Sequence, residues 1–268
     1  RQIARQTNEL GRIQANILTA RVDVKSYFAT GSDAALSRVS DRLGATRKII
    51  DAALPLFDDE SEIARVTGIE NDVATYEDTF NRASALFARD SELDATLNTI
   101  GPKAEASLTK VMTEAFSDNN LAESQAAALA MRELMMVRVY AVRYMSDATE
   151  ANADEALAEY KAFSEALGKL AGFQIDAARK AEIGTVKSSM DAYGAALTEM
   201  IDVVTQRNDL IINTLDVLGP QIADLSEKLK LEEKAIQDEL GPRIVANIGS
   251  TILFALIVSG IALILGAL

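Results

Sequence analysis

The sequence predicts an all-α fold, with two stacked four-helix bundles built from two long and four short helices, followed by a C-terminal transmembrane helix. Three observations support this prediction. The 268 residues include four prolines and no cysteine, histidine or tryptophan, which is typical of long helices. Apolar residues recur at alternating spacings of three and four along helix-length runs. A sequence repeat of about 118 residues occurs twice in the chain.

The internal repeat divides the chain into two halves. Several residue types recur at an offset of 117 or 118 positions. The matched residues are Arg21 with Arg138, Tyr27 with Tyr144, Arg89 with Arg207, Leu97 with Leu215, and Gly101-Pro102 with Gly219-Pro220. We therefore expect the same order of helices in both halves.

The first half predicts two short helices and one long helix. The first covers residues 1–30 and meets the turn signal Gly31-Ser32-Asp33. The second covers 33–54 and ends at Pro55, because proline cannot continue a helix without losing a hydrogen bond. The third starts after residue 59 and continues to the polar turn at 117–120.

The second half repeats this order over about 121–148, 151–170 and 174–240. A helix of about 58 residues reaches about 87 Å, so we expect each long helix to pass both short helices of its half. The expected bundles are a lower one of about 1–30, 88–148 and 206–240 and an upper one of about 33–86 and 151–204. A coiled-coil rod is the competing arrangement, but the turn signals demand hairpins.

The last 25 residues, 244–268, carry no charge. As a helix they span about 37 Å, which exceeds the roughly 30 Å hydrocarbon core of a bilayer. This segment therefore predicts a transmembrane helix, with a buried core helix as the alternative. Residues 1–243 are then expected to form a soluble domain delivered to a membrane, although the nearby basic residues alternate with acids and give no orientation.

Composition excludes several functions. Without histidine or cysteine the chain has no Ser-His dyad, thiol nucleophile, usual zinc site or disulfide. A net charge of −13 argues against nucleic acid as a partner. No nucleophile motif or phosphate-binding loop is evident, so we expect no enzyme, no cofactor and no metal.

Candidate ligand-binding residues lie where a polar side chain interrupts an apolar stripe. Asn208 interrupts the stripe of the last long helix, and Asp90 interrupts the stripe of the first. Each follows an arginine, Arg207 or Arg89. A polar break at the same place in both halves indicates a shared role.

Reflecting the chain through hairpin turns near residues 56 and 171 places Arg21 and Arg138 level with these breaks. Arginine's planar fork of donors suits bidentate capture of a carboxylate, so we expect an anionic ligand, with Asp90 neutralising one arginine and Asn208 donating to the ligand. The candidate set is Arg21, Arg89, Arg138, Arg207, Asn208 and Thr214. The alternative is that these arginines pair with nearby acids and that the asparagine only fixes register.

Three stretches resemble a known family. They are residues 16–22 with 25–28, the duplicated Gly-Pro sites at 100–102 and 218–220, and the run 237–243. Over residues 1–243 the chain is similar to the helical bimodular sensor domains of bacterial methyl-accepting chemotaxis receptors. Some sensor histidine kinases carry the same module.

The resemblance implies a homodimeric receptor in the cytoplasmic membrane, with residues 1–243 on its periplasmic or extracellular side. It also implies a small carboxylate ligand, a site in the lower bundle to which Arg21, Arg138 and Arg207 best correspond, and a second site in the upper bundle. We expect ligand binding to shift the last long helix slightly, and Pro242 either passes this shift into the membrane or loosens the joint. The alternatives are the sensor domain of a histidine kinase and a membrane-inserting or structural helical protein.

Overall fold

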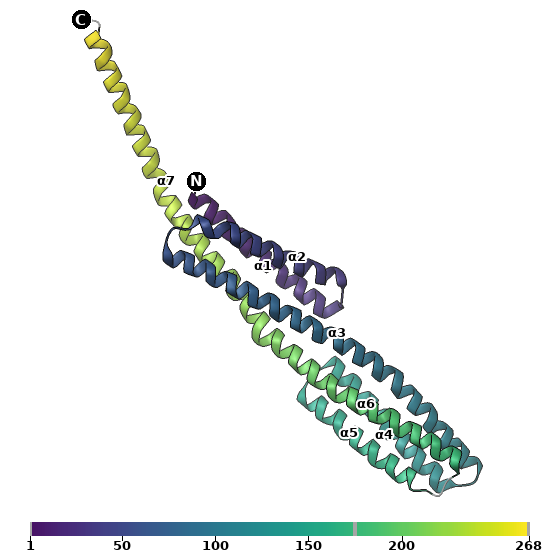
Figure 1. The fold of residues 1–268 in the computed structure, drawn as a ribbon. Helices are drawn as coiled ribbons and strands as arrows, with labels where there is room; N and C mark the ends of the chain where they lie inside the picture. Colours follow the sequence, from purple (N-terminus) through teal and green to yellow (C-terminus); the bar gives the residue numbers. More distant parts are fainter. Residues whose placement is uncertain (1, 174–175, 267–268) are drawn as a thin grey trace. The chain divides into compact units, whose positions relative to one another are not determined.

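The computed structural model describes residues 2–173 and 176–266, without the side chains of 244–251, 253–258 and 260–266. Every regular element in this part of the chain is helical, which confirms the all-α prediction (Figure 1). The elements are α1 (Gln2–Thr30), α2 (Asp33–Ala53), the 3-10 turn η1 (Leu54–Leu56), α3 (Glu60–Ser117), α4 (Leu121–Ser146), α5 (Glu150–Ala171), α6 (Ala177–Leu210), the π-helical turn η2 (Ile211–Leu215) and α7 (Asp216–Gly266).

The two long helices of the prediction are present. One is α3, which continues through Pro102, and the other is the run of α6, η2 and α7, which continues through Pro220 and Pro242. Proline removes a helical hydrogen bond, yet the helix continues past each of these positions. The turn signals at residues 31, 57–59, 118–120 and 147–149 mark the helix ends, as the sequence predicts.

The chain forms two compact units. Unit 1 comprises residues 1–80 and 212–268, and unit 2 comprises residues 81–211. In unit 1, α1, α2, the first part of α3 and α7 meet around a core of fully buried apolar residues. These include Leu10, Ile13, Ile17, Val39, Leu43, Val66, Ile69, Val73 and Ile222.

Unit 2 is built from the rest of α3 with α4, α5 and α6. Its core is likewise continuous and contains apolar side chains from all four helical segments. Its members include Leu108, Leu134, Val137, Tyr144, Phe163, Leu170, Val186, Tyr193 and Met200. Each unit therefore buries its own hydrophobic core.

This grouping of helices differs from the bundles expected at 1–30, 88–148 and 206–240 and at 33–86 and 151–204. The reason is the first turn, where Gly31 adopts a φ of 65° and donates its N–H to the Tyr27 carbonyl oxygen at 2.8 Å. Glycine tolerates this left-handed conformation, which ends α1 and folds α2 back along it. The chain has thus already reversed before residue 56, so α1 and α2 share one unit.

No helix in the described part of the chain is long and apolar enough to cross a membrane. The segment 244–268, for which the sequence predicts a membrane span, forms the C-terminal end of α7 as far as Gly266. Most of its side chains, together with residues 267 and 268, lie outside the described residues.

Candidate ligand-binding site

In unit 2, the Arg138 side chain of α4 lies across Gly101 of α3. A Cβ atom added to Gly101 would meet Arg138 Nε at 3.0 Å and Cδ at 3.1 Å, so the glycine leaves the room that the arginine occupies. One turn along α3, Glu105 accepts a hydrogen bond from Arg138 Nη1 at 2.7 Å. The Arg138 side chain is 32% exposed, so its guanidinium remains accessible.

Unit 1 contains the equivalent arrangement. The Arg21 side chain of α1 lies across Gly219 of α7, where an added Cβ atom would come within 2.7 Å of Arg21 Cδ. The pairing is crossed with respect to the repeat: an arginine from each half covers the Gly-Pro site of the other half. The duplicated residues therefore form two similar contacts, one in each unit.

A buried tyrosine accompanies each arginine. Burial raises the pKa of Tyr193 to about 12, and the charge of the nearby Arg138 acts in the opposite direction. In unit 1, burial raises the pKa of Tyr76 above its usual range, opposed by the charge of Arg21 and reinforced by Asp216. Tyr76 and Tyr193 are 117 residues apart, which is the offset of the repeat.

A pocket of about 450 Å³ borders Arg138 in unit 2, and we call it the Arg138 pocket. Residues of α3, α4 and α6 line it. They are Leu97, Asn98, Met135, Arg138, Val139, Ala141, Val142, Arg143, Met145 and Tyr193. Pockets of 300–1,000 Å³ with mostly apolar walls and a few polar groups are typical of small-molecule sites.

The guanidinium and amide groups of the Arg138 pocket come from two helices, α4 and α3. Arg143 is exposed, and its guanidinium carbon lies 4.9 Å from the centre of the Tyr140 ring. No ion pair of Arg143 is found among residues 2–173 and 176–266. Asn98 on α3 donates to Asp94 at 2.8 Å. The pocket therefore offers two guanidinium groups with donors to spare.

The other candidate residues occupy separate positions. In unit 2, Arg207 Nη1 pairs with Asp90 at 2.6 Å, as expected for an acid that neutralises an arginine, and Asn208 Oδ1 accepts from Arg207 Nε at 3.3 Å. Arg89 pairs with Glu199 at 2.7 Å and with Glu92 at 2.8 Å.

Among the described residues, the expected convergence of four arginines is not found within either unit. Asp90, the partner of Arg207, and Gly101, beneath Arg138, are eleven residues apart on α3, or about 16 Å along its axis. Arg21 and Thr214 belong to unit 1, and Thr214 lies in η2. Within unit 2, Arg138 is therefore the candidate that borders a pocket together with a second arginine.

Sequence reasoning missed four residues around Arg138: Asn98, Glu105, Arg143 and Tyr193. Tyr193 had a signal, since it repeats Tyr76 at the offset of 117. The others had none, because their closeness to Arg138 depends on how α3 and α4 are paired and rotated.

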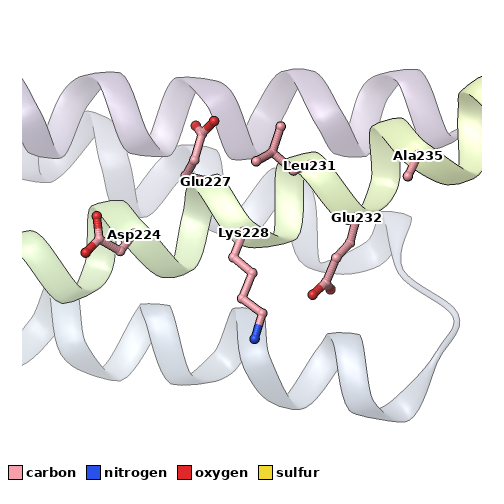
Figure 2. A pocket seen from close by; sticks show the side chains of 6 residues that line it. All are labelled: Asp224, Glu227, Lys228, Leu231, Glu232 and Ala235. Atoms are coloured by element: carbon pink, nitrogen blue, oxygen red, sulfur yellow. The ribbon is translucent and has the colours of Figure 1, made fainter.

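A second hollow, of about 470 Å³, follows α7 in unit 1. Figure 2 shows that its side chains extend from one helix in different directions and do not converge. Two of its acids are already paired, Glu227 with Lys230 and Glu232 with Arg65. This surface lacks the converging groups that a ligand site needs.

The comparisons with known proteins agree with this architecture. The family model described as the helical bimodular sensor domain matches residues 3–232. The chain belongs to this family. Helical bimodular sensor domains are non-catalytic, ligand-sensing modules of bacterial receptors, and a sensor domain implies a small ligand. No curated protein matches the chain.

Proposed function

We propose that this helical bimodular domain is the extracytoplasmic sensing region of a chemoreceptor and that it binds a small organic acid in the Arg138 pocket. The observation that carries the proposal is the pocket itself, in which Arg138 and Arg143 border a cavity of about 450 Å³. Guanidinium groups form charge-assisted, often bidentate hydrogen bonds with carboxylates.

The local charge supports an acid over other ligands. The whole chain carries a net charge of −13, so an anion approaches it against a repulsive background. A carboxylate is retained only where cations gather locally, as Arg138 and Arg143 do on neighbouring turns of α4. Tyr193, buried and close to Arg138, adds a phenol to the wall of the same cavity.

The proposed output passes through the second long helix. This helix contributes Tyr193 to the Arg138 pocket and continues through η2 and α7 toward residues 244–268. In the proposal, residues 244–268 span the bacterial cytoplasmic membrane, residues 1–243 face the periplasm or the exterior, and two copies form the receptor. Carboxylate binding shifts the equilibrium between two positions of this helix, which changes the chemotactic signal.

The proposal is tested by thermal unfolding of the full chain with a panel of small mono- and dicarboxylates. An acid at a hundred times its dissociation constant adds about 2.7 kcal/mol to the stability of the folded state. We expect Arg138→Ala to abolish the shift. Arg132→Ala is the matched control, because Arg132 lies on the same helix, is exposed and pairs only with its neighbour Glu133 in the described part of the chain.

Stabilisation by no acid in the panel would contradict the proposal. Stabilisation that survives Arg138→Ala would also contradict it, because the acid would then bind elsewhere.

A further inference from the structure

We propose, resting on the function proposed above, that the ligand of the Arg138 pocket is a monocarboxylate with an apolar tail. The charges around the pocket, its walls and its size support this class of ligand.

The charges leave room for one carboxylate. Arg138 is already paired with Glu105 at 2.7 Å, and Asp94 lies beside the pocket, where it accepts the Asn98 amide at 2.8 Å. Arg143, which has no ion pair in the described part of the chain, is therefore the one guanidinium of the pocket that no acid neutralises. A second carboxylate on the ligand would enter the pocket without a cation of its own, and a desolvated charge without a partner is costly.

The walls away from the arginines are apolar. Leu97 is buried, Met135 and Met145 are half-buried, and Val139 and Val142 are exposed. Val142 is 58% exposed, and Val139 is 45% exposed. An apolar tail laid against these side chains removes their surface, and its own, from water.

The size of the pocket fits a tail of several carbons. A volume of about 450 Å³ lies in the range of typical small-molecule pockets and far exceeds what a water-sized ligand fills. Methionine side chains are unbranched and adaptable, so Met135 and Met145 suit tails of different shapes. The pocket therefore selects for one acid group and an apolar body.

The experiment is isothermal titration calorimetry of the full chain with acetate, butanoate, hexanoate and hexanedioate. Burial of one methylene group strengthens binding about fourfold, so we expect the dissociation constant to fall by about that factor for each added methylene. Hexanedioate has as many carbons as hexanoate but ends in a second carboxylate, and we expect it to bind at least about tenfold more weakly.

Val142→Thr replaces a methyl group in the wall with a hydroxyl. We expect it to weaken hexanoate binding about fourfold and acetate binding by a smaller factor, because acetate has only one methyl group to bury. Val22→Thr is the matched control, because Val22 is an exposed helical valine of unit 1, at 67% exposure, and does not line the Arg138 pocket.

Affinity that does not change with tail length, or hexanedioate binding as tightly as hexanoate, would overturn this inference. If the acids bound in either of these ways but binding were lost in Arg138→Ala, the proposed function would stand and only the ligand class would be wrong. If no acid bound at all, the proposed function would fail as well.

Discussion

Arg21 in unit 1 and Arg138 in unit 2 have similar surroundings but differ in their hydrogen-bonding partners. Each arginine crosses the glycine of a Gly-Pro pair and lies near a buried tyrosine. Arg138 pairs with Glu105, four residues after its glycine, whereas the equivalent position after Gly219 is the buried Ala223. No hydrogen bond or ion pair of Arg21 is found in the described part of the chain.

The difference shows how the residue four positions after the glycine determines the charge around the arginine of a duplicated site. The glycine determines where the arginine lies, because only a missing Cβ leaves that space. The residue one turn later determines whether the arginine is neutralised. The two units therefore present the same cation in different electrostatic settings.

The largest expected effect is on the folding of isolated fragments, because the two units do not coincide with the two halves of the repeat. Unit 2 is one continuous segment, 81–211, whereas the first repeat half, 1–118, contains only parts of both units. We expect isolated 81–211 to be helical and to unfold cooperatively by circular dichroism, because it contains its whole core. Isolated 1–118 should lack a cooperative transition, and a sharp transition in 1–118 would contradict the division into units.

The second prediction contrasts the buried acids of the two units. In unit 1, Glu233 is 3% exposed, and burial, together with the nearby Glu62 and Glu232, raises its pKa to about 7 against the opposing charge of Arg65. In unit 2, the fully buried Glu123 faces Arg179 at 3.3 Å.

Because the pKa of Glu233 is raised in the folded state, its stabilising contribution is complete below about pH 4.5 and is lost as the pH rises to about 7. We expect Glu233→Gln to add on the order of 2 kcal/mol at pH 8 and little at pH 4.5. Denaturant unfolding at both pH values measures this effect. An equal change at both pH values would show that Glu233 is not protonated in the folded protein.

A third, smaller effect is expected from removing the charge that distinguishes the two arginines. Glu105→Gln leaves Arg138 without its acidic partner and makes unit 2 resemble unit 1. Partly exposed ion pairs contribute up to about 1 kcal/mol, so we expect carboxylate affinity to rise at most about fivefold. Calorimetric titration measures the change, and a loss of affinity would show that Glu105 positions Arg138 for the ligand.

The smallest effect on stability is expected at the glycines. Gly101→Ala gains up to about 1 kcal/mol of helix propensity but pushes the Arg138 side chain aside, so we expect a net change within about 0.5 kcal/mol. Carboxylate affinity should nevertheless fall. Gly219→Ala is the matched control, since it displaces Arg21 and lies outside the Arg138 pocket, and calorimetry on both variants that found equal losses would contradict the assignment of the site.

The sequence was sufficient for the helices but not for their grouping. Polar turns and glycine gave the helix ends to within a few residues, because these residues act locally on the backbone. The bundles were grouped differently because the two-residue turn at Gly31 reverses the chain, which moves α1 and α2 into one unit. The repeat identified Arg138 and both Gly-Pro sites, but the neighbours Glu105 and Arg143 depend on helix pairing that no local pattern records.

The most direct test of the account follows the guanidinium of Arg138 itself. The side-chain Nε–H signals of the full chain, labelled with ¹⁵N-arginine, would be recorded by NMR during a titration with hexanoate and assigned with arginine-to-lysine variants. Binding of the acid at Arg138 predicts a saturable shift of the Arg138 signal and none for the exposed Arg132. An Arg138 signal that stays in place at saturating acid would contradict it.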